Sequence, residues 1–493
     1  MNPRAVAKIA APLLAIVAAT MLAPLGVAVV EGAQRSALAY LASALICVLF
    51  ALILRRIGKS HGEEVHRKDA IAVVVVVWTL MGIFGGLPFM IEGTLLDPSA
   101  ALFEAFSGFT TTGATVVTDI EGLSQATNLW RCEMHWIGGM GIVVLFVAVF
   151  PQLGVGAKQL FRNEVPGPKT EGLRPRIKQT AVALWWIYGG LTALCAIMMM
   201  LAGMPTFDAI CHAMSTLGTG GYSPKAMSIG AYNSPLIDWI TAAFMLIAGL
   251  NFGLYYAMVR GRWRALFEDP EARFYLGLNL LVTLVITALL WDRGVPAGGV
   301  AEGPYHAGLL DSLRDASFQT LAVTTTTGFM TADFDAYPDV ARYLLFLCMF
   351  IGGCAGSTAG GIKVVRVYLL FKVAAREIRS QASPNVVATV KLGRQSIPPH
   401  VISGVLVFVA TYLLIFVATS LLLVALKLDL ISAMSATVAC LSSVGPGLEA
   451  VGPVQNFAGV HWFGKLALCG CMLAGRLEIF VLLSIFTRSM RTR

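Results

Sequence analysis

The chain alternates between long apolar runs and short polar segments. An α-helix needs about 20 apolar residues to cross roughly 30 Å of hydrocarbon, and ten runs approach that length. We expect these runs to span a membrane: Val6–Val30, Leu38–Leu54, Ala70–Met90, Trp130–Phe150, Ala181–Leu201, Ile237–Val259, Tyr275–Trp291, Tyr343–Phe371, His400–Leu426 and Val460–Thr487. The first run is too long for a removable signal peptide and lacks a convincing cleavage site.

Basic residues gather in alternate loops between these runs. They include Arg55 and Arg56 after the second run, the arginines 260, 262 and 264 after the sixth, the stretches Lys158–Lys178 and Lys363–Arg394, and the tail from Arg488. Loops rich in Lys and Arg stay on the cytoplasmic side, so both termini are predicted to be cytoplasmic. The opposite loops carry the acids Asp97, Asp119, Asp208, Asp333, Asp335 and Asp339.

Four of the outer loops contain a shorter apolar segment followed by a cluster of Thr, Ser and Gly. The clusters read Thr110-Thr-Thr-Gly113-Ala-Thr115, Thr216-Leu-Gly-Thr-Gly220-Gly-Tyr-Ser223, Thr324-Thr-Thr-Thr-Gly328-Phe329 and Ser442-Ser-Val-Gly445-Pro-Gly447. With Gly113, Gly220, Gly328 and Gly445 taken as equivalent, the separations are 107, 108 and 117 residues. Similar clusters that recur at nearly equal separations indicate an internal repeat.

Each repeat holds two full spans and one half-span, so all four run parallel, whereas inverted repeats need an odd number of spans. The predicted fold is an all-α polytopic membrane protein. In it, two leading transmembrane helices precede four repeats of helix, pore helix, filter loop and helix around a pseudo-fourfold pore. The expected units are residues 1–60 for the leading pair, then 61–165, 166–270, 271–395 with an intramembrane gating loop, and 396–493 for the repeats.

Composition excludes several classes of protein. Of the 493 residues, 57% are hydrophobic and only 13% charged, against about 25% charged in soluble domains, which excludes a soluble enzyme and a disordered chain. The net charge of +8 is spread over loops, whereas a nucleic-acid-binding protein concentrates it in a patch. The nine cysteines lie almost wholly in apolar runs without a Cys-x-x-Cys pair, so neither disulfides nor zinc are implied.

The repeated loops favour a cation filter. Non-helical backbone at membrane depth must line protein or water, and rings of backbone carbonyls can replace the hydration shell of K⁺. A single cluster is more typical of a glycine-rich turn or a helix-packing patch than of a filter, but four at one period favour a filter. The candidate ion-binding residues are Thr111, Thr112, Gly113, Gly218, Thr219, Gly220, Thr326, Thr327, Gly328, Ser443, Val444 and Gly445.

Two features below the third loop suggest a gate. The eighth run is interrupted by small residues, among them Gly352, Gly353, Gly356, Ser357, Thr358, Gly360 and Gly361, which have little helix propensity; tight helix packing is the alternative. Arg476 lies inside the tenth run, where a guanidinium costs about 2.5–3.5 kcal/mol. We expect it to bind backbone carbonyls of this loop and to repel cations, the alternative being that its side chain reaches the cytoplasmic interface.

Other polar constellations are weak. Cys132, Glu133 and His135 lack the spacing for joint metal coordination and are expected at a membrane interface, and His212 is expected to be a packing residue. No motif for catalysis or phosphate binding is present, so we predict that the chain is not an enzyme.

The chain also resembles the TrkH-type membrane subunits of the Trk/Ktr/HKT potassium transporter superfamily over nearly its whole length. The segments that carry the resemblance are Phe106–Thr115, Trp136-Ile-Gly-Gly-Met-Gly-Ile142, Leu153-Gly-Val-Gly156, Gly352–Lys363, Gly445-Pro-Gly-Leu448 and Gly475-Arg-Leu-Glu478. The leading helix pair favours TrkH over the shorter Ktr-type subunits. Gly113 stands where sodium-preferring members of the superfamily can carry Ser, which implies potassium selectivity. Family chains often have Asn near Ser443 and Gly near Glu449, so the fourth loop departs from the family pattern.

The resemblance implies K⁺ uptake across the bacterial inner (cytoplasmic) membrane, with Rb⁺ as a substitute for K⁺ and a gating role for the Gly352–Gly361 loop. It also implies a homodimer and a cytoplasmic ring of nucleotide-binding regulatory subunits of the TrkA type, docked on the basic loops. No cofactor is expected beyond the transported K⁺, and the outer acids are expected to gather it. An H⁺- or Na⁺-coupled secondary transporter of a small solute is the alternative, and an intramembrane enzyme is a more distant one.

Overall fold

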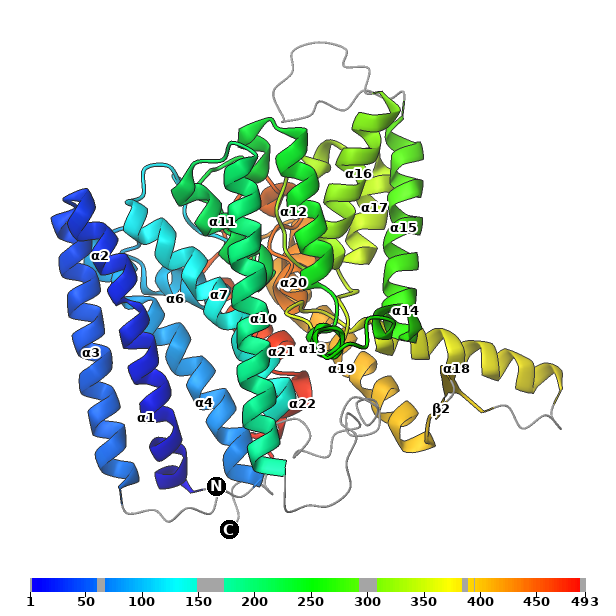
Figure 1. The fold of residues 1–493 in the computed structure, drawn as a ribbon, viewed down its shortest axis with the longest axis horizontal. Helices are drawn as coiled ribbons and strands as arrows, with labels where there is room; N and C mark the ends of the chain where they lie inside the picture. The colour runs from blue at the N-terminus through cyan, green and yellow to red at the C-terminus, as the bar shows by residue number, and fades with distance from the viewer. Residues whose placement is uncertain are drawn as a thin grey trace.

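The computed structural model describes residues 2–59, 67–148, 173–291, 308–383, 389–393 and 395–487, and these form a bundle of helices (Figure 1). Within them, the only strands are β1 (Lys391–Leu392) and β2 (Gln395–Ser396), which pair antiparallel. Most of the basic stretch Lys158–Lys178, the segment Leu153–Gly156 and the tail from Arg488 lie outside the described residues.

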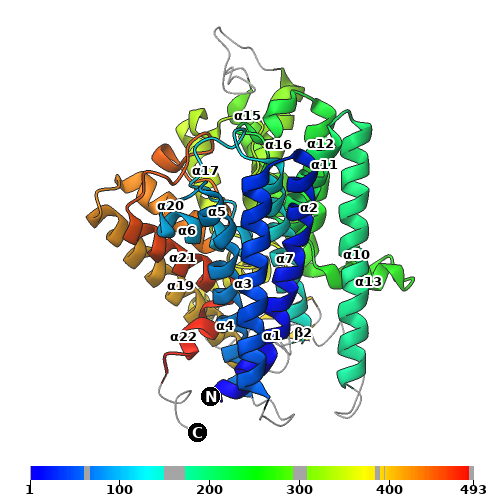
Figure 2. The same ribbon diagram turned by 90° about the vertical axis from the view of Figure 1, so that its left-hand side faces the viewer.

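The leading helices stand side by side at one edge of the bundle, as Figures 1 and 2 both show. They are α1 (Pro3–Thr20), α2 (Leu22–Glu31) and α3 (Gln34–Gly58), with α1 and α2 separated only by Met21. This confirms a leading pair of spans, the first of which is interrupted once.

The remaining helices follow in four groups, one for each Thr/Ser/Gly cluster. The first group is α4 (Arg67–Gly85), α5 (Leu87–Glu92), α6 (Pro98–Phe109) and α7 (Gln125–Ala148). The second is α10 (Leu173–Leu201), α11 (Thr206–Gly218), η2 (Ser228–Tyr232), α12 (Pro235–Ala248) and α13 (Phe252–Val259), followed by α14 (Ala265–Glu268). The third is α15 (Pro270–Leu290), α16 (Leu309–Thr324), η3 (Phe334–Ala336), α17 (Asp339–Cys348) and α18 (Val364–Ala382). The fourth is α19 (Pro399–Ala425), α20 (Leu430–Ser442), η4 (Glu449–Val451), α21 (Trp462–Arg476) and α22 (Ile479–Ser484).

The sixth and tenth predicted spans are not continuous helices, whereas the eighth is interrupted at the small residues where an interruption was expected. Helices α12 and α13 are bent by 91° at Gly249–Asn251, the chain from Met349 to Lys363 is not helical, and α21 and α22 are separated by Leu477 and Glu478. Hydropathy detects apolar composition, whereas these breaks are fixed by hydrogen bonds and close backbone contacts described below.

Six helices among the described residues are long and apolar enough to cross a membrane, or seven if the bent pair counts as one span. The six are Pro3–Glu31, Gln34–Gly58, Lys68–Glu92, Gln179–Leu201, Pro270–Leu290 and Pro399–Ala425. The chain is therefore a mostly helical multi-pass membrane protein.

The short helix α6 is held at its start by a side-chain cap. The carboxylate of Asp97 accepts hydrogen bonds from the backbone N–H of Ser99 at 2.9 Å and from its hydroxyl at 2.6 Å. Both hydrogen bonds lower the pKa of Asp97 below its usual value, and the bond from the Ser99 hydroxyl has the larger effect. Since an N-cap contributes about 1 kcal/mol, we expect Asp97→Ala to lower the thermal midpoint of the detergent-solubilised protein by a few degrees.

The same cap makes stability depend on pH. A lowered pKa means that the charged cap stabilises the fold above the unfolded pKa of about 4, and that this contribution is lost as the pH falls through the lower folded value. Asp97→Asn keeps a capping oxygen without the charge, so its thermal midpoint should fall less than that of the unmodified chain between about pH 5 and pH 3. Equal acid sensitivity of the two chains would exclude this role for Asp97.

Candidate ion pathway

The four short helices α6, α11, α16 and α20 end in the same backbone turn. Each turn has one residue in the left-handed region, with φ between 52° and 59°: Thr111, Thr219, Thr326 and Ser443. The backbone N–H of the following residue then donates to the carbonyl five positions earlier, at 2.8–2.9 Å: Thr112 to Ser107, Gly220 to Ser215, Thr327 to Ala322, and Val444 to Ala439. This hydrogen bond is the Schellman closure of a helix end, and its fourfold recurrence defines the register of the loops.

One residue further on, each loop has a glycine with positive φ, and these glycines pack the loops into a ring. They are Gly113, Gly221, Gly328 and Gly445, with φ of 80°, 83°, 75° and 103°. A Cβ atom on any of them would collide with a backbone carbonyl of the next loop. The contacts run in one direction around the ring: Gly113 against Gly220, Gly221 against Thr327, Gly328 against Val444, and Gly445 against Thr112.

This register corrects the second loop by one residue. The counterpart of Gly113 is Gly221 and not Gly220, so the separations between equivalent glycines are 108, 107 and 117 residues. Gly218 is the last residue of α11 and precedes the left-handed turn. Gly220 is small for another reason, since a Cβ there would meet the imidazole ring of His135. The remaining predicted filter residues lie together in the ring.

The ring has the chemistry of a cation site. Thr111, Thr112, Thr219, Thr326, Thr327, Ser443 and Val444 are fully buried. Within the described parts of the chain, no protein donor reaches the backbone carbonyls of these residues or of Gly220. Buried carbonyls are otherwise almost always hydrogen-bonded, and helix C-termini attract positive charge. A partly dehydrated alkali cation would satisfy these oxygens.

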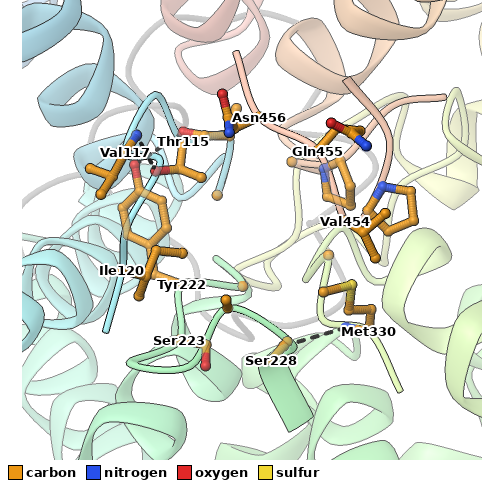
Figure 3. Close-up of a pocket in the computed structure, with 18 of the residues that line it drawn as sticks. Thr115, Val117, Ile120, Tyr222, Ser223, Ser228, Met330, Val454, Gln455 and Asn456 are labelled. Atoms are coloured by element: carbon orange, nitrogen blue, oxygen red, sulfur yellow. Dashed lines mark hydrogen bonds between the residues drawn. The ribbon is translucent and has the colours of Figure 1, made fainter. Parts of the chain in front are cut away.

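A cavity of about 120 Å³ lies beside the ring, lined by the chain that leaves each of the four loops (Figure 3). All four left-handed glycines line it, and around it stand Thr115, Val117 and Ile120, then Tyr222, Ser223 and Ser228, then Met330, and lastly Val454, Gln455 and Asn456. Its charged lining residues are Arg131 and Lys225, and no carboxylate is among its lining residues in the described chain.

The outer acids do not line this cavity, and the expectation that they gather K⁺ stays a prediction. They are engaged in caps and bonds: Asp97 with Ser99, Asp119 with the N–H of Gly122, Asp208 with the hydroxyl of Tyr232, Asp333 with the N–H of Asp335, and both Asp335 and Asp339 with Arg342. Local hydrogen bonding of short acidic side chains in loops explains this outcome.

The non-helical segment between α17 and α18 lies directly beneath the ring. Its ends pair through a parallel bridge between Ile351 and Ile362. The N–H of Gly360 donates to the hydroxyl of Thr326 at 2.7 Å, and a Cβ on Gly360 would collide with the carbonyl of Ser442. The segment therefore touches the third and fourth filter loops.

The other small residues of this segment hold it against its neighbours. Gly352 packs on the carbonyl of Gly360, Gly353 on that of Gly249, and Gly356 on the side chain of Asn251. The hydroxyls of Ser357 and Thr358 donate to the backbone carbonyls of Cys354 and Ala248. Gly361 has a φ of 66°. A backbone this close to its neighbours leaves a space of only about 10 Å³ around Gly360, Gly361 and Arg476.

Arg476 binds this segment as expected. It is 3% exposed and donates to the carbonyl of Thr358 at 2.6 Å and to that of Gly138 at 3.1 Å. Its side chain therefore does not reach the interface. Glu478 pairs instead with Arg366, at 2.6 Å. The buried amino group of Lys363 donates to the carbonyl of Ala359, which places a second basic side chain beneath the ring.

The sequence reasoning missed two buried polar residues behind the ring, Arg131 and His135, and placed Cys132, Glu133 and His135 at a membrane interface. Cys132 and His135 are fully buried and Glu133 is 8% exposed, so they do not lie at an interface. The ring of His135 stacks on Tyr222, with centroids 4.1 Å apart, and the neighbouring Arg131 pairs with Glu104 at 2.9 Å. The available signal was the run of polar residues inside the fourth span, because such residues are costly in lipid. No group of three potential metal-binding side chains occurs among the residues that the structure describes.

Comparison with known proteins gives concordant results. The family model TrkH, described as a cation transport protein, matches residues 39–491. The Trk system potassium uptake protein TrkH of Salmonella typhimurium is 39% identical over 492 residues, which cover 99% of both chains. Its namesake in Vibrio parahaemolyticus is 40% identical over 494 residues, also 99% of both. The crystal structure of the potassium transporter TrkH from Vibrio parahaemolyticus superposes with a TM-score of 0.90 and 36% identity over all of both chains.

Proposed function

Because the chain belongs to the TrkH family of cation transport proteins, we propose that it takes up K⁺ through the ring of filter loops. The observation that carries the proposal is the closed ring of buried carbonyls, to which no donor in the described part of the chain bonds. The names of the relatives, which are potassium uptake proteins of Trk systems, support K⁺ as the cargo. The unpaired carbonyls support a binding role that the family description alone leaves open.

We propose the following path for the ion. K⁺ enters the cavity beside the ring and exchanges hydration water for carbonyl oxygens of the residues that follow the pore helices. The helix C-termini directed at the ring lower the cost of this exchange. Passage onward requires the Gly352–Gly361 segment to move, since it lies against Thr326 and Ser442, and Arg476 opposes cations until it does.

The four units act as repeats of one pore in this proposal, with the boundaries 61–165, 166–270, 271–395 and 396–493. We place the chain in the bacterial inner membrane with a cytoplasmic N-terminus, on the basis of its alternating basic loops. A homodimer, and TrkA-type nucleotide-binding subunits docked on the loops 158–178 and 363–394, remain part of the proposal through family membership.

Uptake into proteoliposomes tests this function. The unmodified chain should accumulate radioactive Rb⁺ and discriminate strongly against Na⁺. Gly113→Ser should raise the Na⁺/Rb⁺ flux ratio by about tenfold or more, because a Cβ at this position meets the Gly220 carbonyl and a tenfold change needs only about 1.4 kcal/mol.

Gly93→Ser is the matched control. Gly93 also has positive φ, 91°, but a Cβ there meets nothing within 4 Å, so this variant reproduces the backbone strain without the collision. Its flux ratio should equal that of the unmodified chain. Equal Rb⁺ and Na⁺ flux in the unmodified chain would rule out a selective filter.

A further inference from the structure

Among the buried polar residues of each pore helix, one lies at nearly the same distance from the filter turn and bonds to the chain beyond that turn. Glu104, His212 and Gln319 each lie seven positions before the left-handed residue of their loop, and Ser435 lies eight positions before Ser443. All four are fully buried. Their side chains differ, being a carboxylate, an imidazole, an amide and a hydroxyl, but their position recurs.

These four residues bond to the same part of their loops, the chain that leaves the filter four to six positions after the turn. Glu104 accepts from the hydroxyl of Thr115 and the N–H of Val116, both at 3.0 Å. His212 contacts the hydroxyl of Ser223 at 3.0 Å. Gln319 donates to Thr331 and to the carbonyl of Ala332, both at 3.3 Å, and Ser435 bonds the N–H of Leu448 at 3.0 Å.

We propose that Glu104, His212, Gln319 and Ser435 are positioning residues that set the selectivity of the filter by fixing the width of each loop. The inference rests on the proposed function, since it assigns to these residues the shape of the ring that binds K⁺. Each joins the pore helix to the departing strand of its own loop. The bend between them, which carries the unpaired carbonyls, is thereby held at both sides.

In His212 the roles of the ring nitrogens follow from the partners. Nδ1 lies 2.8 Å from the carbonyl of Asp208, which can only accept, so Nδ1 carries the proton. In the neutral ring Nε2 is then an acceptor, and the Ser223 hydroxyl donates to it. The neutral imidazole of His212 thus accepts a hydrogen bond from a hydroxyl of the second loop, as the carboxylate of Glu104 does in the first.

Arg131 bonds to residues of both the first and the second loop. Its guanidinium donates to Glu104 at 2.9 Å, to the hydroxyl of Thr115 at 3.2 Å, and to the carbonyl of Ser223 at 3.3 Å. It also lies 4.2 Å above the ring of Tyr222. The Tyr222 hydroxyl in turn donates to the carbonyl of Ala114, at 3.1 Å, so the first two loops are cross-linked at one corner of the ring.

In this proposal the width of the ring excludes Na⁺, because carbonyls held apart cannot close around the smaller ion. Loss of a support should therefore change the ratio of Na⁺ to Rb⁺ flux, and not merely the amount of active protein. A residue needed only for folding would lower both fluxes together.

The test compares Rb⁺ and Na⁺ uptake by variants in proteoliposomes, normalised to the amount of monodisperse protein inserted. We expect Glu104→Ala and His212→Ala to raise the Na⁺/Rb⁺ ratio by about tenfold, which corresponds to about 1.4 kcal/mol. Glu104→Gln keeps an acceptor for the Val116 N–H and should raise the ratio less. Gln319→Leu, which leaves no buried ion unpaired, should also raise it and serves as the decisive variant if Glu104→Ala does not fold.

Glu133→Gln is the matched control, because this buried carboxylate lies on α7 two positions from Arg131, yet no hydrogen bond joins its side chain to a filter loop in the described chain. Its ratio should be that of the unmodified chain. Folded Glu104→Ala, His212→Ala and Gln319→Leu with unchanged ratios, or with both fluxes reduced equally, would overturn the inference while leaving K⁺ uptake intact. A failure of the proposed function is distinct, because the unmodified chain would then show no Rb⁺ uptake or no discrimination against Na⁺.

Discussion

Replacing Gly221 by alanine is expected to reduce selective Rb⁺ uptake by more than about tenfold in chains that insert normally. The left-handed backbone alone costs a residue with a Cβ about 1–2 kcal/mol. At this position the new methyl group also collides with the backbone carbonyl of Thr327, which cannot move without displacing the third loop. Uptake of Rb⁺ and Na⁺ into proteoliposomes measures the effect.

Gly203→Ala is the control for this variant, since Gly203 has a φ of 95° and open space around its Cα. Gly220→Ala tests the register independently. Its methyl group meets the imidazole of His135, so adding His135→Ala to Gly220→Ala should partly restore Rb⁺ uptake, measured against His135→Ala alone. Adding His135→Ala to Gly221→Ala should leave Rb⁺ uptake impaired. The reverse pattern would show that Gly220 is the ring glycine.

Arg476→Ala is expected to raise Rb⁺ flux through the chain by about one to two orders of magnitude. A unit charge about 6 Å from a passing cation contributes roughly 3 kcal/mol of repulsion at an effective dielectric constant of about 20. The same substitution removes the bonds to the carbonyls of Thr358 and Gly138, which hold the segment beneath the filter. Both effects favour passage, and initial rates of Rb⁺ uptake report them.

Two further variants separate charge from position. Arg476→Lys keeps the charge and should remain close to the unmodified rate. Arg342→Ala removes an arginine that pairs with Asp335 and Glu449 away from the segment, and should leave the rate unchanged. An Arg476→Ala protein with unaltered Rb⁺ flux would remove Arg476 from the gating mechanism.

Much of the pathway is predictable from the sequence because its residues are chemically unusual for a membrane. The four Thr/Ser/Gly clusters are too polar for lipid, and the period between them indicates equivalent loops. Arg476 is costly enough in hydrocarbon that a polar partner had to exist, and the carbonyl of Thr358 is that partner.

What the sequence does not determine depends on contacts between distant residues. Gly220 and Gly221 are adjacent, and only the turn at Thr219 and the imidazole of His135 distinguish their roles. The break at Gly249–Asn251 occurs inside an apolar run, where hydropathy continues without interruption. The pairing of Glu104 with Arg131 joins residues 27 positions apart, on two helices whose relative rotation no periodicity specifies.

The ring of loops also has a consequence for how the protein is made. Its last joint brings Gly445 against the carbonyl of Thr112, and the N–H of Phe457 donates to the carbonyl of Thr115 at 2.8 Å. A chain emerges from the ribosome N-terminus first, so this joint forms only after more than 330 further residues have been synthesised. Until then the nascent protein has three loops without their fourth neighbour. A partly synthesised chain in the membrane therefore has no closed ring. The first three loops reach their final packing only when the fourth loop has been made.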